Sequence, residues 1–211
     1  MIGYLLIGAA VVANVAFTGL GSVFGYPDVL QDPPAEVLAR FHADAWVIGG
    51  LFLLLALGAG LLAPVAIGLG TSRAAVRVGV AAAAVQVAGL LRWPLIVPFV
   101  DDPETFRTLN LVLGQLIGES AGYALTAAWT VLVALGLHRA GRLDRWSAGA
   151  GIVTAAMIAT GLLVPFDVPG ADLANFVGYV GWSLWLVALG IRLIVRRRQI
   201  PPVTRTVVPV A

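Results

Sequence analysis

Long apolar runs alternate with short polar segments along the whole chain, and six of the runs are long enough to cross a membrane. A bilayer core about 30 Å thick needs roughly 20 apolar residues in an α-helix, and lipid offers no partner to exposed irregular backbone. Each run therefore predicts one transmembrane helix. We place the six spans at residues 3–25, 44–69, 74–98, 108–137, 147–166 and 172–195.

The composition supports an all-α, polytopic membrane bundle. Of the 211 residues, 60% are hydrophobic and 11% are charged, whereas a soluble domain has about 25% charged residues. We expect a single transmembrane domain over residues 1–198 and a flexible cytoplasmic tail over residues 199–211, in which prolines recur. The first span has no basic stretch before it, so we expect it to be a span rather than a cleaved signal.

The loops predict three antiparallel helical hairpins. Aromatic residues, prolines and acids open one set of loops, and the returning helices close with Ala-Leu-Gly. The openings are Tyr26-Pro27-Asp28, Pro98-Phe99 and Pro165-Phe166-Asp167, and the closings are Ala56-Leu57-Gly58, Ala134-Leu135-Gly136 and Ala188-Leu189-Gly190. Asp32 and Asp102 each precede a proline, a pattern typical of an acid that caps a helix N-terminus.

The arginines predict the orientation, because short cytoplasmic loops collect basic residues. Ten of the 13 basic residues fall on one side of the predicted spans: Arg73, Arg77, Arg139, Arg142, Arg145, Arg192, Arg196, Arg197, Arg198 and Arg205. Both termini fall on that side and are therefore predicted to be cytoplasmic. The richness in Ala, Gly, Val and Arg is typical of a GC-rich bacterial genome, so we expect a multi-pass protein of a bacterial plasma (inner) membrane.

Several kinds of chemistry are excluded by composition. The chain has no cysteine and no lysine, which removes disulfides, thiolate nucleophiles, Schiff bases and a phosphate-binding P-loop. We expect no cofactor, no metal and no nucleic-acid partner. His42, with Glu36 and Asp44 nearby in sequence, is interpreted as a solvated loop histidine rather than a metal ligand. The Gly-x-Ser-x-Gly match at residues 118–122 lies inside an apolar helix, where it cannot form the strained turn that a serine hydrolase needs.

Two ionisable residues lie inside the spans, where a charge costs about 2.5 to 3.5 kcal/mol or more. Arg92 is in the third span and Glu119 is in the fourth, at comparable depths. Because consecutive antiparallel helices tend to pack together, we predict that Arg92 and Glu119 form an ion pair. Such a pair either fixes the helix register or lines a functional cavity.

The fourth span carries two stripes with four-residue spacing. Gly114, Gly118 and Gly122 allow a neighbouring backbone to approach closely. Gln115, Glu119 and Tyr123 place an amide, a carboxylate and a phenol along one line. Other spans offer polar groups that could face them: Asn14, Thr18, Ser22, Gln86, Trp93, Asn175, Tyr179 and Trp182.

The candidate ligand-binding residues are Arg92, Trp93, Gln115, Glu119, Tyr123, Asn175 and Tyr179. Glu119 is also the single candidate catalytic residue. The alternative is that these polar side chains only join helices to one another by hydrogen bonds. Among the tryptophans, Trp46, Trp93 and Trp146 fit the interfacial belt, whereas Trp129, Trp182 and Trp185 are predicted to pack in the interior.

Several motifs together resemble a known family. They are Phe24-Gly25-Tyr26-Pro27-Asp28, Glu36-Val37-Leu38-Ala39-Arg40-Phe41, Gly89-Leu90-Leu91-Arg92-Trp93-Pro94, Val97-Pro98, Gly118-Glu119, Gly122-Tyr123, Thr126 and Trp129-Thr130. The chain resembles an uncharacterised bacterial six-span membrane family, domain-of-unknown-function family 4386, from about Phe24 to Arg192. The resemblance implies the six-span topology and directs attention to Arg92 and Glu119, but it implies no activity.

Three functions remain open. The first is a membrane protein that is not an enzyme and that binds or passes a small or lipidic ligand in an external-half cavity around Arg92, Gln115, Glu119 and Tyr123. The second is a membrane-embedded enzyme acting on a lipid or isoprenoid, with Glu119 as general acid or base. The third is an accessory subunit that binds another membrane protein. The expected partners are membrane lipids, with a ligand, a membrane-protein partner or a second copy of the chain as further candidates.

Overall fold

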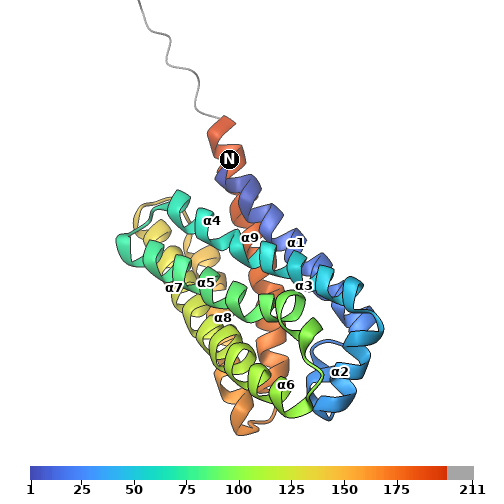
Figure 1. The fold of residues 1–211 in the computed structure, drawn as a ribbon. Coiled ribbons are helices and arrows are strands. Elements are labelled where there is room, and N and C mark those ends of the chain that lie inside the picture. The colour runs from blue at the N-terminus through green and yellow to red at the C-terminus, as the bar shows by residue number, and fades with distance from the viewer. Residues whose placement is uncertain (199–211) are drawn as a thin grey trace, which may run out of the picture.

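The computed structural model describes residues 1–198 and is all-helical, without strands in that part of the chain (Figure 1). Six helical segments are long and apolar enough to cross a membrane, as the sequence predicted: Ile2–Phe24, Ala45–Leu69, Arg73–Phe99, Pro103–Arg139, Arg145–Phe166 and Ala171–Arg196. The fourth span begins earlier than expected, at Pro103. The predicted tail, residues 199–211, lies outside the described residues.

Several spans consist of more than one helical element. The first is α1 (Ile2–Phe24) and the second is α3 (Ala45–Gly60) followed by α4 (Leu62–Leu69). The third is α5 (Arg73–Leu95) with the 3-10 turn η2 (Val97–Phe99), and the fourth joins α6 (Pro103–Leu109), η3 (Asn110–Ala121) and α7 (Gly122–Arg139). The fifth is α8 (Arg145–Ala159) with η4 (Thr160–Phe166), and the sixth is α9 (Ala171–Arg198). The first loop contains η1 (Asp28–Gln31) and α2 (Pro34–Ala43).

The spans pack in chain order and form a closed ring. Each packs against the span before it and the span after it, and α9 packs against α1 to close the ring. At that closure the two backbones nearly touch, since a methyl group at Gly3 would lie 2.6 Å from the carbonyl oxygen of Gly190. Packing between successive pairs of helices is extensive throughout, so the grouping into three hairpins stays a prediction.

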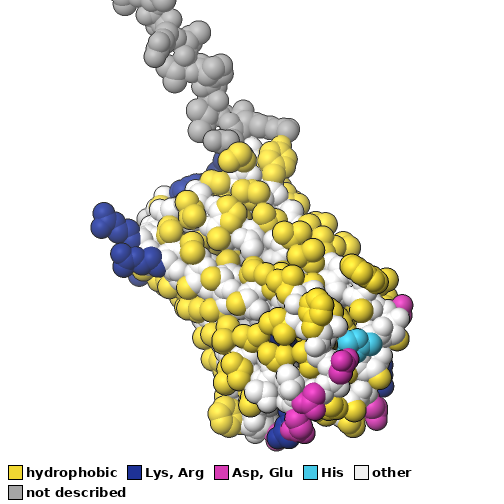
Figure 2. Space-filling model, in the orientation of Figure 1, with side chains coloured by type: hydrophobic (Ala, Val, Ile, Leu, Met, Phe, Trp, Pro, Cys, Tyr) yellow, Lys and Arg dark blue, Asp and Glu magenta, His cyan; other side chains and the backbone are white. Residues whose placement is uncertain are grey.

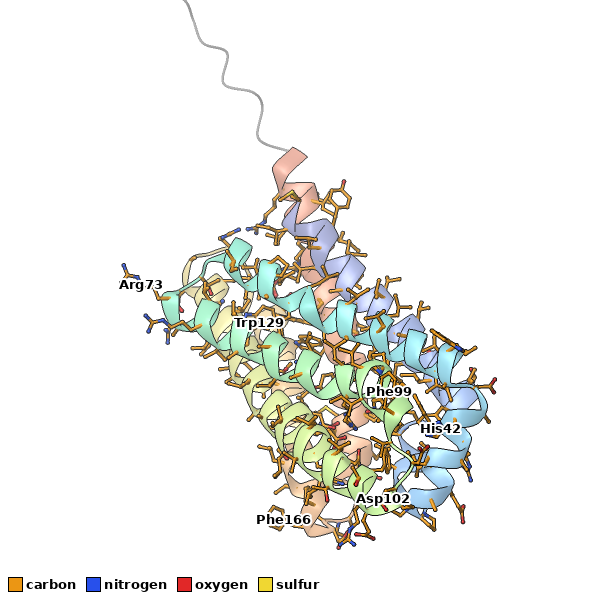
Figure 3. All side chains as sticks on the ribbon, viewed as in Figure 1. His42, Arg73, Phe99, Asp102, Trp129 and Phe166 are labelled. Carbon is orange, nitrogen blue, oxygen red and sulfur yellow. The ribbon has the colours of Figure 1, made fainter. Side chains whose placement is uncertain are left out.

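The two ends of the bundle differ in charge. The N-terminus and the end of α9 lie at the same end (Figure 1), near the arginine-rich loops, and acidic side chains gather at the opposite end (Figure 2). Arg73 and Asp102 mark these two ends in Figure 3. Which end faces the cytoplasm stays a prediction from the arginine distribution.

The acid-rich end has its own aromatic core. Trp93 is fully buried there and stacks on Phe52 at 4.7 Å between ring centroids, with Phe24, Phe41 and Phe106 around it. The expectation that Trp93 belongs to the interfacial belt was therefore wrong. The sequence places Trp93 near the end of a span, but α2 and the loop after α1 cover that end.

The remaining tryptophans divide as the sequence suggested. Trp46 and Trp146 are 95% and 77% exposed, as side chains at a membrane surface would be. Trp129 and Trp185 are buried in a second apolar core nearer the arginine-rich end, and Trp182 packs against it.

One of the two predicted acid caps is confirmed. Asp102 caps α6, where its carboxylate accepts a hydrogen bond from the backbone N–H of Thr105 at 2.8 Å. The cap predicted for Asp32 was wrong, because α2 begins one residue later with Pro33 at the N-cap. Asp32 instead pairs with Arg40 at 3.0 Å on the surface.

Candidate functional site

Arg92 is buried in the last turn of α5, with 3% of its surface exposed. Its Nη1 donates to the carbonyl oxygen of Gly89 at 2.6 Å, and its Nη2 donates to the side-chain oxygen of Asn110 at 2.8 Å. The guanidinium also lies 5.2 Å from the ring centroid of Trp93. Its Nε has no partner in the described part of the chain. Hydrogen bonds to two neutral oxygens and a contact with an aromatic face therefore stabilise this buried charge.

The predicted ion pair between Arg92 and Glu119 was wrong. The ion pairs formed within residues 1–196, whose side chains the structure describes, are Arg40 with Asp32, Arg107 with Glu104 and Arg192 with Asp144. The carboxylate of Glu119 makes neither an ion pair nor a hydrogen bond with any described residue, and the side chain is only partly buried. Arg92 still acts electrostatically on Glu119, so the two charges are neighbours that do not touch.

The physical reason lies in the segment that carries Glu119. Asn110–Ala121 is a π-helix, whose backbone hydrogen bonds join residues five apart rather than four apart as in an α-helix. The prediction of an ion pair required α-helical geometry through this span. In the wider helix Asn110, rather than Glu119, carries the oxygen that reaches Arg92. Helical segments of this kind are rare and are often found at functional sites.

The glycine stripe does permit close packing, as predicted. All three of its glycines face α5. A methyl group at Gly114 would lie 2.6 Å from Nη2 of Arg92, and one at Gly118 would lie 3.1 Å from Cα of Gly89. A methyl group at Gly122 would lie 3.0 Å from the side chain of Gln86. The stripe therefore seats α5 and the buried guanidinium against the fourth span.

Glu119 belongs to a group of polar side chains that we call the polar cluster: Tyr26, Arg92, Glu119, Tyr123 and Tyr179. Burial raises the pKa of the Tyr26 phenol above its ordinary value, the charge of Glu119 adds to the rise, and Arg92 opposes it. The charge of Glu119 also acts on Tyr123 and Tyr179, whose rings lie 5.8 Å apart. The first loop and spans three, four and six thus converge.

The other candidate residues have different surroundings. Asn175 is buried and donates to the carbonyl oxygen of Ile158 at 2.6 Å, and a methyl group at Gly161 would overlap both Asn175 and Tyr123. Asn175 therefore adjoins the polar cluster but has a partner of its own. Trp93 belongs to the aromatic core, and Gln115 is partly buried without a hydrogen bond to any described residue.

The polar side chains of the first span do not join the cluster. Asn14, Thr18 and Ser22 are exposed, and Asn14 and Ser22 each donate to a carbonyl oxygen of their own helix. Elsewhere polar groups join helices, as the alternative reading expected. Gln86 donates to the hydroxyl of Thr126 at 3.0 Å, and Trp182 donates to the hydroxyl of Thr130 at 2.8 Å.

Sequence reasoning missed two members of the site. Asn110 lies four residues before Gly114, so it continues the glycine stripe by one step, and that spacing was the available signal. Tyr26 was noted only as part of a loop motif. Its ring packs against Phe52 and Phe17, with centroids at 5.2 and 5.8 Å, and this contact directs a loop residue toward the bundle.

Metal ligands do not gather anywhere in residues 1–198, where no group of three or more His, Cys, Asp or Glu side chains could hold an ion. His42 is exposed and its ring lies 3.1 Å from the carbonyl oxygen of Val100, which joins α2 to the loop after η2. None of the candidate ligand-binding residues lines the surface pocket between α8 and α9 or the one beside the start of α1.

The six apolar helices define a multi-pass helical membrane protein. The chain matches the family described as domain of unknown function DUF4386 over residues 1–190. The chain therefore belongs to that family. No curated protein and no solved structure matches it.

Proposed function

We propose that the polar cluster is a binding site for a small or lipidic ligand, and that Glu119 is its primary contact. The observation that carries this proposal is that Glu119 is a partly accessible carboxylate without a protein partner inside a transmembrane span. An ionisable group at that depth is costly unless something compensates it. Arg92 does not do so directly, because Gly89 and Asn110 hold its guanidinium.

The surroundings indicate the chemistry of the ligand. Glu119 accepts hydrogen bonds when ionised, whereas the phenols of Tyr26, Tyr123 and Tyr179 both donate and accept. Their rings, with that of Trp182 at 6.0 Å from Tyr179, add apolar surface. A ligand with a hydroxyl or amine group on an apolar body fits both properties. An amphipathic molecule of that kind can enter from the membrane.

The test is to identify by mass spectrometry the small molecules that copurify with the protein. Wild type is compared with Glu119→Gln and Arg92→Ala, and Glu104→Gln is the control, since Glu104 lies on the surface and pairs with Arg107. We expect a molecule that is present with wild type and with Glu104→Gln but is depleted with Glu119→Gln. The same set of molecules in all four preparations would refute the proposal.

A second candidate is supported by the same unpaired carboxylate, because a group without a fixed partner can exchange a proton. The chain would then be an enzyme acting on a lipid or isoprenoid, with Glu119 as general acid or base. Glu119→Gln separates the two functions. A binding protein loses its ligand, whereas an enzyme that loses turnover retains its substrate, so the copurifying molecule increases.

A further inference from the structure

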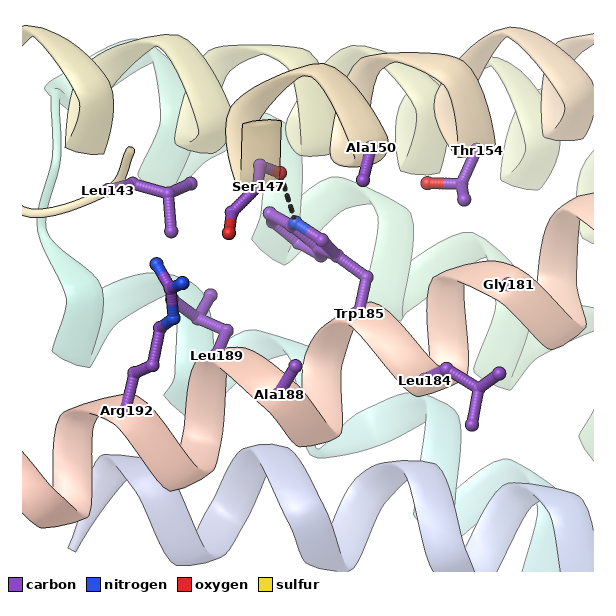
Figure 4. Close-up of a pocket in the computed structure, with 10 residues that line it drawn as sticks. All are labelled: Leu143, Ser147, Ala150, Thr154, Gly181, Leu184, Trp185, Ala188, Leu189 and Arg192. Atoms are coloured by element: carbon purple, nitrogen blue, oxygen red, sulfur yellow. Dashed lines mark hydrogen bonds between the residues drawn. The ribbon is translucent and has the colours of Figure 1, made fainter. Parts of the chain in front are cut away.

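A groove lies between α8 and α9, and Figure 4 shows the side chains that line it. Its volume is about 300 Å³. Ala150, Gly181 and Ala188 line it with little side-chain bulk, which leaves the space open. Its floor is the buried ring of Trp185, whose Nε1 donates to the carbonyl oxygen of Ser147 at 2.8 Å.

One end of the groove is charged. Arg192 lies there with 45% of its side chain exposed, and its Nη1 pairs with Asp144. A guanidinium has five N–H donors in total, so this pair leaves others for a further acceptor. Arg145 and the exposed ring of Trp146 lie at the start of α8 nearby, with the guanidinium 5.0 Å from the ring centroid. Arginine beside tryptophan is typical of the membrane interface.

The length of the groove matches one leaflet. Gly181 and Arg192 lie about three turns apart on α9, or roughly 16 Å at the rise of an α-helix. Half of the hydrocarbon core of a bilayer is about 15 Å thick. The apolar part of the groove therefore lies in one leaflet when Arg192 is at the interface. Its open side then faces the hydrocarbon core of the bilayer, so acyl chains of lipids can enter it.

We propose that this groove binds one anionic glycerophospholipid. An acyl chain lies over Trp185 between α8 and α9, and the phosphate accepts hydrogen bonds from Arg192. The surrounding arginines favour an anionic headgroup over a zwitterionic one, since each basic residue near a membrane surface adds attraction for anionic lipid. This site is separate from the polar cluster, and neither proposal depends on the other.

The test measures phospholipid bound to the delipidated protein by native mass spectrometry, with phosphatidylglycerol and phosphatidylcholine as probes. Delipidated wild type is expected to bind one phosphatidylglycerol molecule and to bind phosphatidylcholine more weakly. Ala150→Phe fills the groove and lowers binding about tenfold, a change equivalent to about 1.4 kcal/mol. Ala156→Phe is the matched control, because Ala156 is an exposed residue of α8 that does not line the groove.

A second pair of variants tests the charge. Arg192→Gln is expected to lower phosphatidylglycerol binding about fivefold, the factor that one basic residue near the surface contributes. Arg77→Gln is the control at the same end of the bundle and should leave binding unchanged. Ala188→Phe fills the groove from α9, so it repeats the test independently should Ala150→Phe fail to fold.

Three results would overturn the proposal. One is unchanged binding in both Ala150→Phe and Ala188→Phe. Another is an equal loss in Ala150→Phe and its control Ala156→Phe. The third is a dimer of wild type that Ala150→Phe dissociates, because a second copy of the chain would then occupy the groove.

Discussion

Arg92 carries a positive charge inside the bundle, and its guanidinium donates hydrogen bonds to two neutral oxygen atoms. A charged group buried without partners costs far more than a neutral one, so the bonds to Gly89 and Asn110 are needed for the span to be stable. Gly89 lies on the same helix as Arg92, whereas Asn110 lies on the next span. Asn110 is therefore the residue that ties the third span to the fourth through this charge.

The first prediction compares the two neighbours of Arg92. Asn110→Ala removes a hydrogen bond to a buried charge and should lower the free energy of unfolding by about 2 kcal/mol. Glu119→Gln breaks no hydrogen bond within the described chain and should change it by less than about 1 kcal/mol. Thermal unfolding of both variants in the same detergent measures the difference. A larger loss of stability with Glu119→Gln than with Asn110→Ala would support a direct ion pair between Arg92 and Glu119.

The sequence directed attention to Arg92 and Glu119, but the ion pair predicted between them was wrong. Arg92 and Glu119 could be selected because intramembrane charges are rare, and Tyr123 and Tyr179 followed from helical spacing. The pairing could not be predicted, because it depends on a π-helix that hydropathy does not reveal. Asn110 is an ordinary polar residue in a sequence, and only the packing of Gly114 against Arg92 gives it a role.

The backbones of α5 and η3 approach each other closely where the two helices cross. A methyl group at Gly89 would lie 2.6 Å from Cα of Gly118 and 2.9 Å from the carbonyl oxygen of Leu113. Both are backbone atoms, which cannot move aside as a side chain can. The crossing therefore depends on glycine at both positions.

The second prediction tests this crossing. Gly89→Ala should lower the free energy of unfolding by about 1 to 3 kcal/mol, the usual cost of overpacking. The control is Gly50→Ala in α3, where a methyl group meets no atom within 4 Å. That substitution should be neutral or stabilising by up to about 1 kcal/mol, because alanine favours a helix over glycine. Equal stability of the two variants would contradict the crossing.

The third prediction concerns the acid caps of two helices. Hydrogen bonds from the hydroxyl and backbone N–H of Thr105 lower the pKa of Asp102, and the backbone N–H of Ser147 followed by Arg192 lowers the pKa of Asp144. A carboxyl whose pKa is lowered by folding stabilises the protein above its unfolded value and loses that effect on protonation. Stability should therefore fall as the pH drops below about 4.

Asparagine separates capping from titration, because it caps helices as well as aspartate does but does not ionise in this range. The double variant Asp102→Asn, Asp144→Asn should lose less of its thermal stability than wild type between about pH 6 and about pH 3, a range that spans the ordinary carboxyl pKa values. The measurement is the unfolding midpoint across that series. If wild type and the variant were equally sensitive to acid, these caps would not be the cause of that sensitivity.

The fourth prediction tests the orientation of the whole molecule. Because the chain has no cysteine, a single introduced thiol can be labelled without background. Asp101→Cys, in the acid-rich loop after η2, should react with a membrane-impermeant maleimide applied to intact cells. Ala140→Cys, in the arginine-rich loop after α7, should react only after the membrane is opened. The reverse pattern would invert the predicted topology.

At this scale the sequence was most informative. Hydropathy predicted six spans because each needs about 20 apolar residues whatever its neighbours are. It could not predict how the spans meet, since packing in lipid depends on small residues and hydrogen bonds rather than on apolar character. The contact between Gly3 and Gly190 joins residues that are far apart in the sequence, and no local sequence pattern predicts it.

That contact has a consequence for biosynthesis. During translation α1 is made before α9, so the face of α1 that holds Gly3 has no partner while the intervening spans are inserted. Lipid or an insertion factor must cover that face until α9 arrives. The ring is therefore completed after synthesis of its sixth span, and a ribosome halted before Gly190 would leave an open bundle for the quality-control proteases of the membrane.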